Sequence, residues 1–260
     1  MKRIDDIVEW FSETPSVIVA LSGGVDSALV AYAAHNSSHT KAMAVTADYM
    51  TLAEDELKSA KNVALQIGIK HHIIQYSELN DEEFTKNDKN RCYHCRTQMG
   101  QRLRALADET KYHAIVDGTN ADDVFDYRPG MRAIAEHGIQ SPLLELGIKK
   151  SHIRTLALQA GLDVHDRPSN SCLASRIPWG RRITAQMLAR IEMAEKYVKD
   201  IVPVGPVRVR DINGTARIEV SKDCIQQIHS HVDRLDEILR LLGFDSVVIR
   251  EYVSGGANTQ

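Results

Sequence analysis

The sequence predicts an α/β fold, in which a doubly wound parallel sheet is followed by a smaller α+β domain. Over residues 1–168, strand-like apolar runs alternate with amphipathic helical segments, a pattern typical of a parallel sheet covered by helices on both faces. Near the N-terminus, one such strand runs into a glycine turn and then a helix. After Arg167-Pro168 the pattern changes, so we expect one domain over 1–168 and a second over 169–260.

In the first domain, the spacing of apolar residues predicts alternating helices and strands. Helices are expected at 4–11, 28–34, 54–67, 97–107 and 151–160, and strands at 17–21, 41–47, 71–75 and 114–117. Gly68 is expected to end one helix as a C-cap, and Ser151 to begin another as an N-cap. Residues 81–91 are polar and are expected to form a loop.

In the second domain, we expect a helix at 184–199, a hairpin, a helix at 223–242 and a strand at 246–253. The hairpin strands are predicted at 206–212 and 216–221, because Asn213-Gly214 between them is a strong signal for a two-residue turn. Cys224 falls in the second of these helices, and its expected role is packing.

Composition limits the class of protein. The chain has 260 residues, a formal net charge of −3, 43% hydrophobic residues and 26% charged residues, as in an ordinary soluble domain protein. It has no long basic run, so no nucleic-acid partner is expected. It has neither a signal-like segment nor an apolar run long enough to cross a membrane, so we expect no membrane association and a cytoplasmic location. The four cysteines are then expected as thiols, ligands or catalysts before disulfides.

The strand at 17–21 ends in the motif Ser22-Gly23-Gly24-Val25-Asp26-Ser27, which predicts a phosphate site. Two glycines let the backbone approach an anion closely, and the N–H groups of the first helical turn point at it. Ser22 and Ser27 add hydroxyl donors, and Asp26 is a candidate ligand for Mg²⁺. The motif is neither a Walker A loop nor a GxGxxG fingerprint. The alternative is a glycine turn that only packs tightly.

Polar residues follow two other predicted strands, at Asp48 and at Gly118-Thr119-Asn120-Ala121-Asp122-Asp123. Ligands of parallel sheets bind beyond the carboxyl ends of the strands, so these groups are expected to converge with the phosphate loop. The carboxylates of Asp122 and Asp123 suit Mg²⁺ or a ribose. The alternative is a helix N-cap with acidic residues in its first turn.

Two cysteine motifs indicate further chemistry. Cys92-Tyr93-His94-Cys95 places two sulfurs within reach of one metal or cluster, between the predicted loop and a helix start. A structural zinc site that uses His94 or Cys224, or a redox-active dithiol, is the alternative. Cys172 lies between prolines and is flanked by Arg167 and Arg176, which favours a reactive or ligating thiolate over an inert buried thiol.

Arg208 and Arg210 alternate along a predicted strand and therefore point to one face. Together with Arg217 on the hairpin partner, they suit a phosphorylated substrate. The alternative is a solvated strand face, on which Arg217 and Glu219 are ordinary partners.

The motif SGGxDS resembles the PP-loop of ATP pyrophosphatases, which cleave ATP to AMP and pyrophosphate. Together with the Gly118–Asp123 turn and the segment from Pro168 to Pro178, which contains CLASRIP, nearly the whole chain resembles the LarE family. Members of that family are ATP-dependent sulfur transferases that help to make the nickel-pincer nucleotide cofactor of lactate racemase. The resemblance also implies a homo-oligomer and a small-molecule nucleotide substrate.

The resemblance further implies a mechanism. ATP adenylates a carboxylate of pyridinium-3,5-biscarboxylic acid mononucleotide, and a sulfur nucleophile displaces AMP to leave a thiocarboxylate. In some members the cysteine that matches Cys172 gives up its own sulfur and becomes dehydroalanine. In others, which also have a CxxC, three cysteines hold a 4Fe–4S cluster that carries a labile sulfide. Cys92, Cys95 and Cys172 match that set, so the resemblance favours delivery from a cluster.

The implied site residues fall into three groups. ATP and Mg²⁺ are assigned to the phosphate loop, with Asp48 near the adenosine, Gly118 in the nucleotide-binding turn, and Asp26 and Asp123 as magnesium ligands. Cys172 is the residue assigned to catalysis, and Arg208 and Arg210 are expected to hold the substrate phosphate.

Three other functions share parts of this pattern. A tRNA thiolation enzyme shares the PP-loop, the adenylation and sometimes a three-cysteine cluster, but it is expected to carry a basic face or an RNA-binding module. An amide-forming PP-loop synthetase needs an ammonia source and not three placed cysteines. A nucleotide-sensing module would bind ATP without cleaving it.

Overall fold

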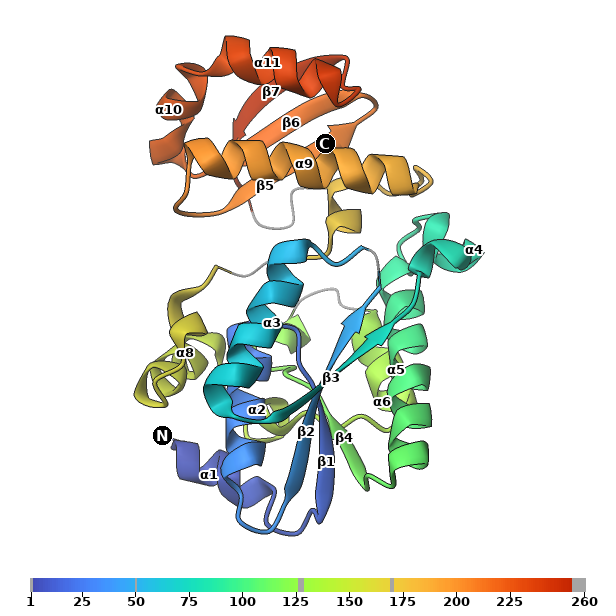
Figure 1. The fold of residues 1–260 in the computed structure, drawn as a ribbon, viewed down its shortest axis with the longest axis vertical. Coiled ribbons are helices and arrows are strands. Elements are labelled where there is room, and N and C mark those ends of the chain that lie inside the picture. The colour runs from blue at the N-terminus through green and yellow to red at the C-terminus, as the bar shows by residue number, and fades with distance from the viewer. Residues whose placement is uncertain (1, 50, 126–128, 169–170, 254–260) are drawn as a thin grey trace. The chain divides into compact units, whose positions relative to one another are not determined.

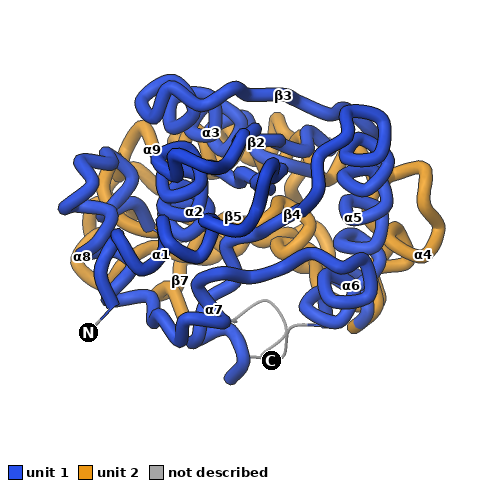
Figure 2. The backbone as a smooth tube through the Cα atoms, turned by 90° about the horizontal axis from the view of Figure 1, so that it is seen from below, with its two compact units in different colours: residues 1–78, 90–169 blue, residues 79–89, 170–260 orange. Residues whose placement is uncertain are grey.

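The chain divides into two compact units, which Figure 2 shows in different colours. The first comprises residues 1–78 and 90–169, and the second residues 79–89 and 170–260. The structure is a computed structural model, and it describes residues 2–49, 51–125, 129–168 and 171–253. Ser169 and Asn170 of the cysteine loop lie outside the described residues.

The first unit is built on a four-stranded sheet, which confirms the predicted fold class (Figure 1). The strands are β1 (Ser16–Ala20), β2 (Lys41–Asp48), β3 (Lys70–Gln75) and β4 (Ala114–Val116). They lie in the order β3-β2-β1-β4 and are all parallel. In the register, Ile18 of the central strand pairs with Met43 on one side and with Ile115 on the other.

Helices cover both faces of this sheet. Val17 and Val19 point to one face and Ile18 to the other, because side chains alternate along a strand. The first face packs against α1 (Ile4–Trp10), α2 (Val25–Asn36), α3 (Glu54–Ile67), α7 (Pro142–Glu145) and α8 (Lys150–Gln159). The second packs against α5 (Arg91–Thr110) and α6 (Gly130–Glu136). Each turn that leaves the carboxyl edge of the sheet is therefore held on a rigid layer.

Of the helix ends predicted from capping residues, the end at Gly68 is confirmed and the start at Ser151 is wrong. Gly68 ends α3 with φ +79°, as predicted. The expectation that Ser151 begins α8 was wrong, because the helix begins at Lys150 after the flanking Lys149. The backbone N–H of Lys150 donates to Asp122 Oδ2 at 2.8 Å, so a distant carboxylate satisfies this N–H in place of a local hydroxyl.

The second unit contains a three-stranded mixed sheet in the order β5-β6-β7. Its strands are β5 (Val207–Ile212), β6 (Thr215–Val220) and β7 (Ser246–Glu251), with β5–β6 antiparallel and β6–β7 parallel. Asn213 and Gly214 have φ of +51° and +90°, as the predicted two-residue hairpin turn requires. The helices of this unit are α4 (Glu82–Thr85), α9 (Ala185–Ile201), α10 (Ile225–His229) and α11 (Val232–Leu241).

The single helix expected at 223–242 was wrong. A short 3₁₀ turn (Lys222–Cys224) leads into α10, and the helix is interrupted between α10 and α11. Ser230 is the cause, because its hydroxyl donates to the carbonyl of Gln227 at 2.8 Å and competes with the helical hydrogen bonds. Cys224 is therefore in the 3₁₀ turn, where its sulfur accepts a hydrogen bond from Ser221 Oγ at 3.1 Å.

The polar segment at 81–91 is also more ordered than expected. It contains α4, in which Phe84 is buried, and the first residue of α5. Asn87 has φ +56°, and its amide donates to the carbonyls of Pro178 at 2.8 Å and of Arg181 at 2.9 Å. These bonds explain why residues 79–89 group with the second unit.

Further short 3₁₀ turns lie at Glu78–Asn80, Asp123–Phe125, Asp163–Asp166 and Leu173–Arg176. Across the described ranges, no helix is both long enough and apolar enough to cross a bilayer.

Candidate active site

The phosphate loop connects β1 to α2 and is held closed by the Ser27 hydroxyl. This hydroxyl accepts from the Ser22 N–H at 3.1 Å, lies 3.0 Å from Ser22 Oγ and donates to the Gly24 carbonyl at 3.1 Å. The Gly24 N–H donates to Ser22 Oγ at 3.3 Å. The first N–H groups of α2 have no partner within the helix, so the loop presents donors at a positive helix end. This arrangement suits an anion.

The two loop glycines have different structural reasons. Gly23 has φ +79°, and a Cβ there would lie 2.7 Å from Ala60 N and 2.8 Å from Glu56 O, so only glycine fits. Gly24 has φ −87°, and a Cβ there would meet only Ser22 Oγ at 3.4 Å. Tight packing therefore accounts for Gly23 but not for Gly24. Gly24 is the N-cap of α2, a position that favours glycine, and the lack of a side chain there also leaves room for a ligand close to the backbone.

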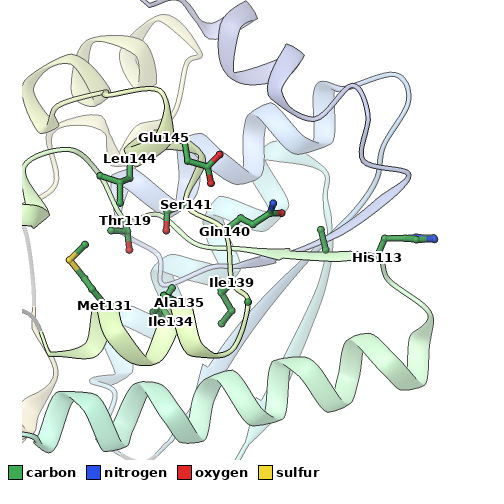
Figure 3. Close-up of a pocket in the computed structure, with 12 residues that line it drawn as sticks. His113, Thr119, Met131, Ile134, Ala135, Ile139, Gln140, Ser141, Leu144 and Glu145 are labelled. Carbon is green, nitrogen blue, oxygen red and sulfur yellow. The ribbon is translucent and has the colours of Figure 1, made fainter.

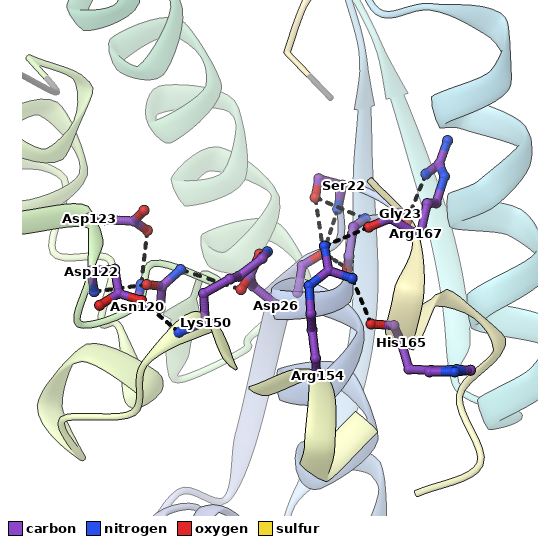
Figure 4. Close-up of polar contacts among 12 residues, drawn as sticks. Ser22, Gly23, Asp26, Asn120, Asp122, Asp123, Lys150, Arg154, His165 and Arg167 are labelled. Atoms are coloured by element: carbon purple, nitrogen blue, oxygen red, sulfur yellow. Dashed lines mark hydrogen bonds and ion pairs between the residues drawn. The ribbon is translucent and has the colours of Figure 1, made fainter. Parts of the chain in front are cut away.

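The turn after β4 lies against the phosphate loop. The sequence predicts this, because both follow the carboxyl ends of strands in one parallel sheet. A Cβ on Gly118 would lie 2.6 Å from Ser27 N and 2.9 Å from Ser27 Cα. The amide of Asn120 donates to Asp26 Oδ1 at 3.3 Å, and the Asn120 N–H donates to Asp123 Oδ2 at 3.0 Å (Figure 4). Asp26, Gly118 and Asp123 thus belong to one cluster.

Lys150 completes this cluster and was not found from the sequence. Its ammonium group pairs with Asp26 Oδ2, and both side chains are partly exposed (Figure 4). Asp26 and Lys150 are 124 residues apart in the chain, so no local pattern connects them. The only signal was a lysine at a predicted helix start, where the helix itself attracts anions.

Asp48 lies at the carboxyl end of β2. Its carboxylate accepts from Gln75 Nε2 at 3.1 Å, and its carbonyl accepts from the Tyr76 N–H at 3.1 Å. These contacts fix Asp48 to the neighbouring strand β3, on the same edge of the sheet as the phosphate loop.

The CxxC motif differs from its expected placement between a loop and a helix start. Helix α5 begins at Arg91, so Cys92 and Cys95 lie within its first turns, three residues apart and on one face. Cys92 is exposed, and Cys95 is partly buried. The Cys95 thiol lies within hydrogen-bond reach of the Glu78 carboxyl, which also accepts from Thr51 Oγ1 at 2.6 Å. Burial raises the pKa of Glu78, against the lowering effect of these hydrogen bonds.

In the second unit, the Cys172 loop is built around one buried arginine. Arg176 is fully buried and binds Glu195 through two nitrogens, at 2.7 and 3.1 Å. Its remaining nitrogen Nη1 donates to the carbonyls of Ser171 at 2.6 Å and Cys172 at 3.1 Å. Arg167 also has a carboxylate partner, Glu56, at 2.8 Å. The two flanking charges are thus paired with carboxylates, and their effect on the Cys172 thiol stays a prediction.

Arg208 and Arg210 are both buried in β5, and they lie close to the Cys172 loop. Arg210 pairs with Glu219 at 2.8 Å and donates to the Ser175 carbonyl at 3.1 Å. Burial lowers the pKa of the Arg208 guanidinium, and the nearby Arg176 charge lowers it further. The second unit therefore brings Cys172, Arg208 and Arg210 into one neighbourhood. It also contains the pair of Arg176 and Glu195, which was not predicted from the sequence.

A separate cavity of about 630 Å³ lies beside β4, α6 and α7 in the first unit (Figure 3). Its polar lining includes His113, Thr119, Gln140 and Ser141, and Met131 and Ile134 are among its apolar lining. Of the segments predicted from the sequence to form the nucleotide site, the Gly118–Asp123 turn contributes Thr119 to this lining.

Comparisons with known proteins agree with this geometry. A family model described as asparagine synthase matches residues 10–137, which hold the phosphate loop and the Gly118 turn. An uncharacterized protein from Synechocystis sp. is 37% identical over 260 residues, covering 98% of this chain and 97% of that protein. An uncharacterized protein from Methanocaldococcus jannaschii is 30% identical over 249 residues, covering 96% of this chain and 94% of that protein.

A relative with a named activity is pyridinium-3,5-bisthiocarboxylic acid mononucleotide synthase from Lactiplantibacillus plantarum. It is 30% identical over 244 residues, covering 94% of this chain and 88% of that enzyme. The match spans both units, and thus includes the ATP-binding half and the cysteine loop. The chain therefore belongs to the LarE family of ATP-using sulfur transferases.

Proposed function

We propose that this chain adenylates a carboxylate of pyridinium-3,5-biscarboxylic acid mononucleotide and converts it to a thiocarboxylate. The observation that carries the proposal is the similarity to the named synthase over both units, not over the ATP-binding half alone. In the first step the carboxylate oxygen attacks the α-phosphorus of ATP, and pyrophosphate leaves. In the second, a sulfur nucleophile attacks the acyl carbon, and AMP leaves.

The phosphate loop is the proposed binding site for the pyrophosphate end of ATP. The Gly24 N–H and the first N–H groups of α2 donate to the phosphate oxygens, and the hydroxyls of Ser22 and Ser27 add donors. Gly23 and Gly118 let the loop and the turn after β4 pack in this shape, because a side chain at either would collide with neighbouring backbone. Asp48 is the proposed contact for the adenosine.

Lys150 has two roles in this proposal. In the structure described here it neutralises Asp26. Asp26 and Asp123 suit Mg²⁺, because carboxylate oxygens are its preferred protein ligands and both side chains hydrogen-bond to Asn120. Asp26 and Asp123 would hold the Mg²⁺ that accompanies ATP, which would neutralise phosphate charge. The Lys150 ammonium would then bind the phosphate oxygens, where its charge would stabilise the leaving pyrophosphate.

Arg208 and Arg210 are the proposed contacts for the substrate phosphate. Arg210 is oriented by Glu219 and by the Ser175 carbonyl. A guanidinium that is partly desolvated, as burial makes Arg208, binds a phosphate more strongly than one in water. This arrangement holds the substrate beside the loop that carries Cys172.

The sulfur source follows from the three cysteines. Cys92 and Cys95, one helical turn apart, fit two thiolate positions of a 4Fe–4S cluster, and Cys172 of the second unit supplies the third. Such a cluster supplies a labile sulfide when bound. Among the described residues, the structure shows no group of three or more metal-ligating side chains, so the cluster is proposed from the cysteine pattern and the family resemblance.

A sacrificial route uses Cys172 alone. Its sulfur displaces AMP to form a thioester. Loss of the Cα proton and cleavage of the Cβ–S bond then give the thiocarboxylate and dehydroalanine. We favour the cluster because the CxxC has no part in the sacrificial route.

The intact mass of the protein after anaerobic turnover tests the proposal. Delivery from a reconstituted cluster leaves the mass of the polypeptide unchanged while thiocarboxylate forms. A loss of H₂S located at Cys172 would favour the sacrificial route instead. Absence of any thiocarboxylate, with ATP and the dicarboxylated nucleotide present, would overturn the proposed function.

Amide formation is a second candidate, because the matching family model is that of asparagine synthase. That match ends at residue 137, before Cys172 and the arginines of β5. AMP release that depends on glutamine or ammonia would favour it. A cytoplasmic location and a homo-oligomer stay predictions.

A further inference from the structure

We propose that Arg167 is a positioning residue that couples occupancy of the phosphate loop to the order of the neighbouring segment 164–168. This inference rests on the proposed function. It concerns a side chain whose guanidinium lies in the first unit against the loop that is expected to bind ATP.

The contacts of Arg167 make a clamp. Its Nη1 donates to the Gly23 carbonyl at 3.0 Å, and its two terminal nitrogens bind the two carboxylate oxygens of Glu56 at 3.2 and 2.8 Å. The Arg167 and Glu56 side chains are only 25% and 12% exposed. A bidentate pair of this kind fixes both position and orientation, which a single contact does not.

The Gly23 carbonyl and the Gly24 N–H belong to one rigid peptide plane. A donor that holds this carbonyl therefore also sets the direction of the Gly24 N–H, which is one of the expected phosphate contacts. Conversely, a phosphate that binds the Gly24 N–H fixes the orientation of this peptide plane. The hydrogen bond from Arg167 to the Gly23 carbonyl is then strengthened. The link is physical, because the two groups share six coplanar atoms.

The backbone of Arg167 is held as firmly as its side chain. Arg154 Nη2 donates to the Arg167 carbonyl at 2.9 Å, and Arg154 Nη1 donates to the His165 carbonyl at 2.8 Å (Figure 4). The Arg167 N–H donates to the Val164 carbonyl at 3.2 Å. Pro168 follows and fixes its own φ, which stiffens the departure of the chain. Figure 4 shows the Arg154 side chain reaching from α8 to this short segment.

Ser59 provides a matched control. Its hydroxyl donates to the same Gly23 carbonyl at 2.9 Å, but it lies on α3 and has no link to residues 164–168. Ser59→Ala therefore weakens the phosphate loop but leaves the proposed coupling intact. Arg167→Gln removes both a contact with the Gly23 carbonyl and the coupling. Arg167→Lys keeps the charge but loses the bidentate geometry, and Glu56→Gln weakens the clamp from the other side.

Hydrogen–deuterium exchange of the full chain, with and without Mg²⁺ and α,β-methylene-ATP, tests the coupling. In the wild type and in Ser59→Ala, the analogue is expected to slow exchange at residues 164–167 by about 5-fold or more. In Arg167→Gln the slowing at those residues disappears while slowing at 22–30 remains. Arg167→Lys and Glu56→Gln give intermediate slowing, and they keep the test available if Arg167→Gln does not fold.

Three results would overturn the inference: no slowing at 164–167 in the wild type, unchanged slowing there in Arg167→Gln, or equal loss of slowing in Ser59→Ala. The exchange readout needs only nucleotide binding, so it stands apart from the proposed chemistry. If no variant or wild type makes thiocarboxylate, the proposed function fails while the exchange result still decides the coupling.

Discussion

The two glycines of the phosphate loop allow a sharp separation of folding from ligand binding. The perturbations are Gly23→Ala and Gly24→Ala, which add the same methyl group at adjacent positions. The structure predicts opposite outcomes, because Gly23 is required by the fold and Gly24 is not.

The magnitudes follow from the local geometry. At Gly23 a left-handed backbone with a Cβ costs about 1–2 kcal/mol, and a contact at 2.7 Å with Ala60 N adds roughly 1–3 kcal/mol of overpacking. At Gly24 the backbone suits any residue, and the smaller N-cap preference of alanine is offset by the lower entropy of the unfolded chain. We therefore expect a change below about 1 kcal/mol there.

Thermal unfolding with and without Mg²⁺ and α,β-methylene-ATP measures both effects. Without nucleotide, the unfolding temperature of Gly24→Ala is expected to be close to that of the wild type, and that of Gly23→Ala several degrees lower. The conversion is roughly 2–4 °C of unfolding temperature per kcal/mol of lost stability. With nucleotide at about 100 times its Kd, the wild type gains about 2.7 kcal/mol, and Gly24→Ala gains little because the methyl group occupies the space of a phosphate oxygen.

Either of two results would refute this reasoning. A full nucleotide-induced shift in Gly24→Ala would mean that phosphate does not approach the backbone at that residue. A wild-type unfolding temperature in Gly23→Ala would mean that the loop does not have the described left-handed conformation against α3.

Three further predictions concern other parts of the chain. Lys150→Gln is expected to release pyrophosphate at least about 10-fold more slowly at saturating ATP, since a positioned charge on the leaving group is lost; an unchanged rate would remove Lys150 from the site. Arg176→Met is expected to cost about 3–5 kcal/mol in urea unfolding, because Glu195 remains buried without its partner; adding Glu195→Leu should recover most of the loss, and no recovery would contradict the account. The pKa of His71 lies below its usual 6.5, mainly through burial and also through the Lys61 charge, so the unfolded state takes up the proton first and stability falls as pH drops from about 6.5 toward the folded-state pKa; His71→Gln should flatten that fall, and an equal slope would show that other groups cause it.

The sequence was most informative where one local signal decides the structure. The left-handed Gly68 and the turn at Asn213 and Gly214 depend on the backbone freedom of individual residues, and both are as predicted. The phosphate loop was identified for the same reason. Its order of strand, glycines and helix is contained within one short stretch of chain.

The parts that were missed depend on contacts between distant residues. Lys150 meets Asp26 across 124 residues, and Arg176 meets Glu195 inside the second unit. No periodic pattern reports such pairs. The break at Ser230 was missed because the apolar spacing continues through it, while side chains contact the Gln227 carbonyl at the point where the helix ends.

The central claim is that ATP is cleaved between its α- and β-phosphates at the phosphate loop in order to activate a carboxylate for sulfur transfer. The most direct measurement is the identity of the products from α-labelled ATP, with and without pyridinium-3,5-biscarboxylic acid mononucleotide. The account predicts that AMP and pyrophosphate form in equal amounts, and only when the dicarboxylated nucleotide is present. Thiocarboxylate is expected to form at the same rate as AMP. Formation of ADP and phosphate, or cleavage that ignores the dicarboxylated nucleotide, would contradict it.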